Sequence, residues 1–243
     1  MGGQFDEVMY VDIKLRMNRL NVLRASAFSI SPTQAPHEML TWCMEIMLTF
    51  FLFSAPKTYG NFAADIIFLM DSSFDVDQNT LDREKRFVKS MVQSLTLSPD
   101  KSRVAVIGFG NIPDEVVRFS SSQDVTAISR AVDNARKIIG RRNVAKVLEF
   151  TASVLDKARP SVPRVVILLT AGSELYLTSP SQALRDLGTN RYVIAIGPNA
   201  DEEELTPIID EPRDMFTIAT PKELTWNTEY MVSEIVERTG KLY

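Results

Sequence analysis

Cysteine and histidine are almost missing from this chain of 243 residues, which contains one of each, Cys43 and His37. Both precede residue 62, where a regular pattern of apolar and amphipathic segments begins. The part of the chain after that point therefore has no cysteine–histidine zinc site and no disulfide framework. It also lacks a serine–histidine–aspartate triad and a cysteine–histidine pair, which excludes the hydrolytic chemistry that depends on them.

Signatures of nucleic-acid and nucleotide binding are also absent. The formal net charge is −4, and the lysines and arginines form no run long enough to follow a phosphate backbone. The phosphate-binding pattern Gly-x-x-x-x-Gly-Lys-Ser/Thr does not occur, and "GFG" at 108–110 lacks the third glycine of a dinucleotide fingerprint. We interpret "GFG" as a tight turn after a strand, and we expect neither nucleic acid nor nucleotide as a partner.

Residues 1–61 are predicted to be an N-terminal extension that contains a signal-like apolar segment at 39–60. The apolar centre of this segment, about ten residues long, is too short to span a bilayer and suits a secretory signal. Its late position and Glu45 depart from that pattern, and a translation start at Met39 or Met44 would account for the position. The alternative is a buried helix that packs on the domain. The signal interpretation predicts a secreted, extracellular protein.

Residues 62–243 are predicted to form one domain, because short apolar runs alternate there with amphipathic stretches. Runs that are apolar at nearly every position are typical of strands covered on both faces, and the stretches between them have helical spacing. The segment 115–120 is polar at Arg118 and predicts an edge strand. The predicted strands are 66–70, 103–109, 164–170, 192–197 and 215–219, and the predicted helices are 80–95, 124–138, 143–155, 179–188, 201–209 and 227–240.

This order of elements predicts an α/β fold: a doubly wound, mostly parallel sheet with helices on both faces, of the Rossmann-like kind. Ligands of such sheets bind at the carboxyl ends of the strands. The acidic stretch 201–204 is interpreted structurally, with Asp201 as a helix cap and the glutamates facing the positive end of that helix.

The first strand runs directly into Asp71-Ser72-Ser73-Phe74-Asp75. Asp71, Ser73 and Asp75 would present hard oxygen ligands of the kind that Mg²⁺ prefers, which makes them candidate metal ligands. The alternative is that Asp71 and Ser73 only cap the following turn or helix.

The segments "ADIIFLMDSS", "RVAVIGF", "RVVILLTAG" and "VIAIGPNADEEELTPIIDEPRDMFTI" resemble a von Willebrand factor type A domain of the matrix subgroup, similar to those of type VI collagen and matrilins. The resemblance covers residues 63–240. It implies a non-enzymatic, protein-binding module for cell adhesion in an extracellular-matrix protein, with a collagen or another matrix component as partner. An intracellular scaffold of the same fold and a hydrolase or nucleotide-dependent enzyme are the alternatives.

The resemblance also implies a metal-ion-dependent adhesion site, or MIDAS, built from three loops. Asp71 and Ser73 match the family's Asp-x-Ser-x-Ser loop, but Asp75 replaces its last serine. Arg142 stands where the second loop has a threonine, and Ala171 stands where the third loop has an aspartate. We predict a degenerate MIDAS without a cofactor, in which Arg142 pairs with Asp71 or Asp75 and replaces the cation. The alternative is a weakened site that still holds Mg²⁺ through Asp71, Ser73 and Asp75.

Overall fold

The computed structural model describes residues 57–241, and the predicted signal-like segment lies almost entirely outside these residues. The described chain is an α/β domain with one sheet of six strands. Between residues 57 and 241 no helix is both long enough and apolar enough to cross a bilayer.

The strands are β1 (Asp65–Asp71), β2 (Arg103–Phe109), β3 (Pro113–Val117), β4 (Arg164–Thr170), β5 (Thr189–Ile196) and β6 (Met215–Ile218). The α-helices are α3 (Gln78–Ser94), α4 (Val125–Asn134), α5 (Val144–Leu155), α6 (Thr178–Asp186), α7 (Glu202–Leu205) and α8 (Pro221–Lys241).

The strand order β3-β2-β1-β4-β5-β6 confirms the doubly wound topology. All neighbouring strands are parallel except β2 and β3, so β3 is the antiparallel edge strand that the sequence predicted at 115–120. The chain turns from β1 to β2 on one side, and it later places β4 on the other side of β1. The carboxyl end of β1 therefore lies at the point where the strand order reverses, which is the expected ligand position in this class of sheet.

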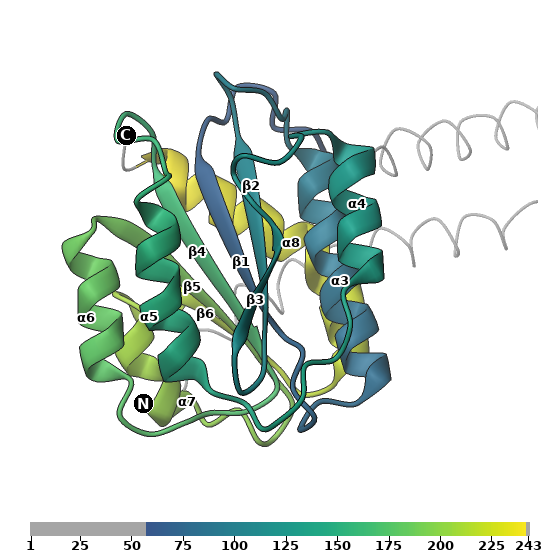
Figure 1. Ribbon diagram of the computed structural model, residues 1–243, viewed down its shortest axis with the longest axis vertical. Helices are drawn as coiled ribbons and strands as arrows, with labels where there is room; N and C mark the ends of the chain where they lie inside the picture. Colours follow the sequence, from purple (N-terminus) through teal and green to yellow (C-terminus); the bar gives the residue numbers. More distant parts are fainter. Residues whose placement is uncertain (1–56, 242–243) are drawn as a thin grey trace, which may run out of the picture. The chain divides into compact units, whose positions relative to one another are not determined.

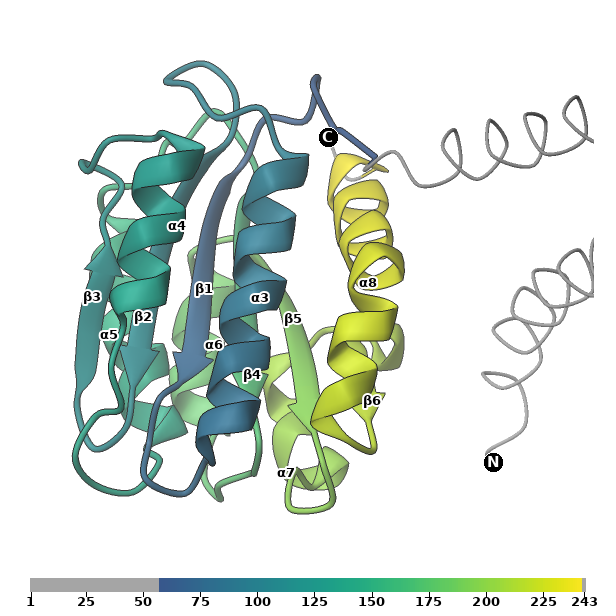
Figure 2. The ribbon, with the colours of Figure 1, turned by 90° about the vertical axis from the view of Figure 1, so that its right-hand side faces the viewer.

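Helices cover both faces of the sheet (Figures 1 and 2). On one face α3, α4 and α8 bury residues such as Phe87, Val132 and Ile235 against alternate strand positions. On the other face α5 and α6 bury Leu148 and Leu184 against the remaining positions. Because successive side chains of a strand point to opposite faces, a sheet covered on both sides requires the continuous apolar runs seen in β1, β2 and β4.

The first described residues join the domain at the amino edge of the sheet, the edge at which β1 begins. The Tyr59 backbone NH donates to the carbonyl of Ser94 at the end of α3 (2.7 Å). The Lys57 ammonium group donates to Ser233 and Glu237 near the end of α8. Residues 57–61, which the sequence assigned to the extension, therefore pack on the domain.

Three predicted helices differ in extent from the observed ones. The predicted helix 201–209 is α-helical only over Glu202–Leu205 and continues as a 3-10 turn over Thr206–Ile208. The predicted helix 124–138 begins at its expected cap, Asp124, whose side chain accepts from the Ala127 NH, but it ends at Asn134. The residues that follow it leave the helix because they bond to the loop after β1. The closing helix begins at Pro221, six residues before the predicted start at 227.

Candidate functional site

Three loops meet at the carboxyl end of β1. They are the β1–α3 loop, the α4–α5 loop over residues 135–143, and the β4–α6 loop over residues 171–177. The parallel register places Asp71 opposite Phe109 of β2, and it places Met70 opposite Leu169 of β4. The three segments that the family resemblance singled out, far apart in the sequence, thus lie together at this edge.

Asp71 is the centre of the site. Its side chain is fully buried, and both carboxylate oxygens are hydrogen-bonded. The Oδ1 atom accepts from the Ser73 hydroxyl (2.7 Å) and from the Ser73 backbone NH (3.2 Å). The Oδ2 atom also lies 3.2 Å from the Thr170 hydroxyl, whose single proton has a closer acceptor in the Gly172 carbonyl (2.7 Å). Asp71 and Ser73, predicted from the sequence, are therefore in direct contact, and Thr170 is a further neighbour that the sequence analysis missed.

Arg142 supplies the positive charge at this carboxylate. Its Nε atom lies 2.6 Å from Oδ2 of Asp71, and only 13% of its side chain is exposed. The backbone NH of Arg142 donates to Oδ2 of Asp75 (2.9 Å). This hydrogen bond, helped by the positive charges of Arg142 and Arg141, holds the pKa of Asp75 below its usual value. Arg142 thus engages both acidic residues of the Asp71–Asp75 loop.

Gly172 makes room for the guanidinium group. A Cβ atom built on Gly172 would lie 2.6 Å from Cζ and 2.9 Å from Nη2 of Arg142, well inside van der Waals contact. The group therefore lies directly against the backbone of the β4–α6 loop, next to Ala171, whose methyl group offers no ligand. The volume between the first and third loops is filled by the arginine.

The loop that carries Arg142 is held by backbone hydrogen bonds. The Ile138 NH donates to the carbonyl of Ser72 (2.7 Å), and the Phe74 NH donates to the carbonyl of Gly140 (3.1 Å). Gly140 has a φ of 103°, and a Cβ there would lie 2.5 Å from that of Asn111. These contacts explain why α4 stops early, because the following residues pair with the β1–α3 loop instead of extending the helix.

A second buried carboxyl group, Glu84 of α3, lies beneath the site and was not anticipated from the sequence. Its Oε2 atom accepts from the Asp71 backbone NH (2.9 Å), whereas Oε1 has no hydrogen-bond partner. Burial, followed by the negative charge of Asp71, raises the pKa of Glu84 well above its usual value. The carboxyl group of Glu84 therefore holds its proton more tightly than an exposed glutamic acid does.

The acidic residue of the third loop serves a helix. Glu174 lies three positions after Ala171, and its Oε2 atom accepts from the backbone NH groups of Val144 (2.5 Å) and Ala145 (3.3 Å). It thus binds the amino end of α5, where unpaired NH groups and the helix dipole favour a negative charge. This position removes the carboxylate of Glu174 from Asp71.

These residues do not fit a divalent cation. Within residues 57–241 no three His, Cys, Asp or Glu side chains form a metal-binding group, so a cation at Asp71 would also need hydroxyl ligands such as Ser73. The Asp71 oxygen that faces the third loop is bonded to Arg142, and Asp75 is bonded to the backbone of the same arginine. Mg²⁺ requires near-octahedral oxygen coordination, and the guanidinium group of Arg142 lies on the side of Asp71 where further oxygen ligands would have to stand.

The loops around Asp71 expose apolar side chains. Seven large apolar residues are exposed in the described part of the chain, and five of them lie on loops at this edge; the other two, Trp226 and Tyr230, lie on α8. Tyr176 has a φ of 68°, which is uncommon for a residue other than glycine. Its side chain is also the most exposed of these seven, with an exposed fraction of 90%. The five are Phe74, Ile112, Ile139, Leu175 and Tyr176.

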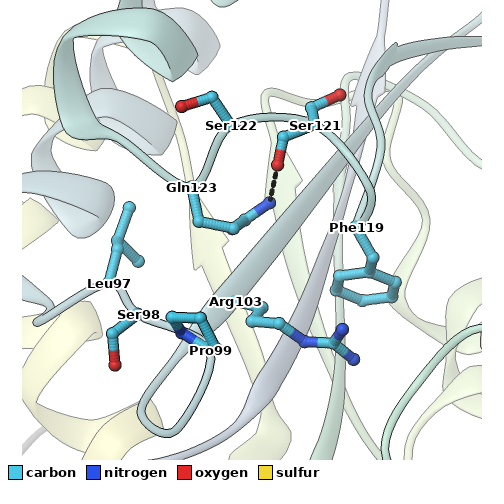
Figure 3. Close-up of a pocket in the computed structure, with 8 residues that line it drawn as sticks. All are labelled: Leu97, Ser98, Pro99, Arg103, Phe119, Ser121, Ser122 and Gln123. Atoms are coloured by element: carbon cyan, nitrogen blue, oxygen red, sulfur yellow. Dashed lines mark hydrogen bonds between the residues drawn. The ribbon is translucent and has the colours of Figure 1, made fainter.

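A pocket of about 420 Å³ lies at the opposite, amino edge of the sheet (Figure 3). Arg103 lines it, but its guanidinium group is bonded to Asp65 and stacks on the ring of Phe119. The side chain of Gln123 is bonded to the backbone of Val104 through both of its polar atoms. Because these polar side chains are already engaged with the protein, the pocket is a weaker candidate than the Asp71 edge.

Comparisons with known proteins agree with this architecture. Matrilin-1 of Gallus gallus is 29% identical over 155 residues, which are 62% of this chain and 31% of that protein. The collagen alpha-4(VI) chain of Mus musculus is 26% identical over 181 residues, which are 73% of this chain and 8% of that one. The chain thus spans less than a third of the length of these two relatives.

Among solved structures, proximal thread matrix protein 1 from the mussel byssus has a TM-score of 0.65 and 26% sequence identity, with 72% of this chain and 46% of that chain covered. A second structure of the mussel protein, with a TM-score of 0.66, has a zinc-occupied MIDAS motif. Residues 65–229 match the family of the von Willebrand factor type A domain. This match covers well over half of the chain, from the first strand into α8, and the chain belongs to the von Willebrand factor type A domain family.

Proposed function

We propose that this domain is a non-enzymatic, protein-binding module of an extracellular-matrix protein and that it binds its partner without a metal ion. The ion pair between Arg142 and Asp71 is the observation that carries the proposal. An arginine stays protonated at any physiological pH, so it supplies a permanent positive charge where a MIDAS would supply a cation. Unlike a metal ion, this charge cannot be removed by a chelator.

The residues around Arg142 support the same conclusion. Gly172 leaves space for the guanidinium group, and Ala171 offers no oxygen ligand. Glu174, the nearest acidic residue of the third loop, is bonded to the amino end of α5. An ion would have to displace a mostly buried arginine from Asp71 and break this ion pair.

The extracellular location and the partner class are inferred from the relatives, whose names include matrilin, collagen and thread matrix protein. A collagen or another matrix component is the partner that we propose. A tagged full-length chain expressed in animal cells tests the location. We expect it in the medium with the apolar segment removed, whereas retention in the cytosol would favour an intracellular scaffold.

Calorimetric titration with Mg²⁺ tests the metal-free site. The wild-type protein should give no heat of binding, because Arg142 occupies the site. A triple variant, Asp75→Ser with Arg142→Thr and Ala171→Asp, restores the family's three loops and should gain Mg²⁺ binding. The double variant without Ala171→Asp is the matched control. Sub-millimolar Mg²⁺ binding by the wild-type protein, abolished by Asp71→Asn, would overturn the proposal.

Binding to immobilised collagens and to a matrix extract, measured with and without EDTA, tests the function itself. The bound amount should be the same under both conditions for the wild-type protein. A partner that is released by EDTA, with the domain itself still folded, would show that the weakened Mg²⁺ site is the correct alternative.

A further inference from the structure

The surface at the carboxyl edge of the sheet carries charge of opposite sign at its two ends. We call residues 136–142 of the α4–α5 loop the basic pole, since they contain four basic residues and no acidic one. We call residues 201–204, at the start of α7, the acidic pole, since all four are acidic. The β4–α6 loop lies between these poles in the order of the strands, and the β1–α3 loop lies beside the basic pole.

Two cations of the basic pole remain available to a partner. Arg142 is bonded to Asp71, and Lys137 donates to the carbonyl of Val76. Arg141, in contrast, has a side chain that is 91% exposed and lies 3.6 Å from Asp75, a loose and solvent-exposed ion pair of small energetic value. Arg136 is exposed and has no ion-pair partner among residues 57–241.

Two anions of the acidic pole are available in the same way. The side chain of Asp201 caps α7 by accepting from the NH groups of Glu203 and Glu204. Glu204 accepts a hydrogen bond from the Ser173 hydroxyl. Glu202 and Glu203 are exposed, and their carboxylates have no ion-pair partner in the described part of the chain.

Backbone hydrogen bonds fix the relative positions of the poles. The basic pole is joined to the β1–α3 loop through Ile138 and Gly140, so it lies over β1 and β2. The acidic pole follows β5, and the Ser173 NH donates to the carbonyl of Asn199 (3.2 Å), which ties it to the β4–α6 loop. Because β4 lies between β1 and β5, the exposed Leu175 and Tyr176 of that loop lie between the two poles.

We propose that this face binds a second copy of the same chain across a two-fold axis. A two-fold interface brings the same patch of both subunits together, so each residue set must complement itself. Rotation about an axis near Leu175 and Tyr176 would place the basic pole of each subunit against the acidic pole of the other. The exposed apolar side chains would be buried at the centre, where interfaces are enriched in aromatic residues and depleted of charge.

The two signs on one face favour a second copy over an acidic ligand. A partner that is simply acidic would use the basic pole and would be repelled by Glu202 and Glu203. In a dimer, the basic pole of each copy contacts the acidic pole of the other, so opposite charges meet at two places. A partner of one sign would bring like charges together at one pole, which costs binding energy. The dimer would cover the Asp71 edge and leave the helix faces, including the exposed Trp226 of α8, for the matrix ligand of the proposed function.

Sedimentation of the full-length chain with paired charge reversals tests the dimer. The wild-type protein should dimerise, and added salt should weaken the dimer because charged groups face each other across it. Arg136→Glu with Arg141→Glu gives a chain with two acidic poles, and Glu202→Arg with Glu203→Arg gives a chain with two basic poles. Each variant alone should dimerise at least about tenfold more weakly. An equimolar mixture should recover the wild-type affinity, because each pole then faces its opposite.

Arg86→Glu with Arg130→Glu is the matched control, since it reverses two exposed charges on α3 and α4, away from the face. This control should dimerise like the wild type, and circular dichroism should show that all variants are folded.

The variant Tyr176→Asn tests the apolar centre of the interface. Asparagine tolerates a positive φ, so this variant should fold normally but dimerise more weakly. A monomeric wild-type protein at every concentration, or folded variants whose mixture stays monomeric, would overturn the proposal. The proposal would also be overturned if the monomer captured an acidic polypeptide and only Arg136→Glu with Arg141→Glu lost this binding.

Discussion

The two ends of β1 each carry a fully buried aspartate that is paired with arginine, and the pairs differ in what surrounds them. Asp65, at the amino end, accepts from both Arg103 and Arg159 through five hydrogen bonds of 2.6–3.0 Å. Asp71, at the carboxyl end, has one arginine and two hydroxyl groups. At one edge, therefore, two arginines surround the aspartate of β1. At the other edge, a single arginine from the α4–α5 loop pairs with it.

The comparison indicates which end is structural and which is suited to binding. The arginines at Asp65 also donate to backbone carbonyls, Arg159 to those of Pro99 and Lys101, so the cluster closes the amino edge of the sheet. Burial alone would raise the pKa of Asp65, but the hydrogen bonds from both arginines outweigh it and lower that pKa. At Asp71, in contrast, exposed apolar residues and uncommitted charges surround the ion pair. Of the two edges, the one at Asp71 has the exposed apolar side chains that a second molecule could contact.

Removal of the Asp65 carboxylate should have the largest effect. Asp65→Asn leaves two mostly buried guanidinium groups without their shared partner, and we expect a loss of about 3–5 kcal/mol in the free energy of unfolding. Urea denaturation measures it. Glu211→Gln, which breaks an exposed ion pair with Arg213, is the control and should cost less than about 0.5 kcal/mol. A loss at Asp65 no larger than at Glu211 would contradict the structural role of the cluster.

Removal of Arg142 should cost less, about 2–3 kcal/mol, because Asp71 keeps the hydroxyl and the backbone NH of Ser73 as donors and lies at an edge that water can reach. Arg142→Ala is compared by urea denaturation with Arg141→Ala, its exposed neighbour, which should be nearly neutral. Arg142→Lys should lie between them, because an ammonium group keeps the charge but loses the planar donor geometry. If Arg142→Ala is as mild as Arg141→Ala, the buried ion pair does not contribute as described.

Crowding the guanidinium group should have a smaller effect. Gly172→Ala puts a methyl group where the guanidinium lies, so Arg142 must move, and overpacking of this kind costs about 1–3 kcal/mol. We expect a value near the lower end, because a long side chain can shift. In the Arg142→Ala background the same substitution should be nearly free, which a double-mutant cycle measures. Additive losses would show that Gly172 and Arg142 are not coupled.

The smallest effect should be a change in pH dependence. The pKa of Glu84 is raised in the folded state, so the folded protein binds this proton more tightly than the unfolded chain does. The resulting stability is fully present below the unfolded pKa and is lost as the pH rises through the folded pKa, with a slope of at most about 1.4 kcal/mol per pH unit. Glu84→Gln keeps the acceptor for the Asp71 NH and should flatten this decline, measured by urea denaturation at pH values above the usual glutamate pKa. An unchanged slope would show that another group causes it.

Asp75 has the opposite sign, because its folded pKa is lowered. Its contribution is present above the unfolded pKa and is lost as the pH falls through the folded pKa. The exposed position of Asp75 makes this contribution small.

The sequence was sufficient to predict the sheet, because strands covered on both faces need unbroken apolar runs, and β1, β2 and β4 have them. Arg142 and Ala171 were identified only through the family resemblance, since their partners are distant in the chain. Glu84 could have been noticed, because it lies on the apolar face of α3 between Leu81 and Val88. The end of α4 could not, because it depends on hydrogen bonds to the β1–α3 loop that no local pattern reveals.

The attachment of Lys57 and Tyr59 to the ends of α8 and α3 places both ends of the domain at the edge opposite Asp71 (Figure 2). Two copies that meet through their Asp71 edges would have all four of these ends directed away from the joint. A force that pulls the ends of one copy away from those of the other would therefore act directly on the contact between the two domains. The force that this contact withstands would depend on ionic strength, since its outer contacts are ion pairs.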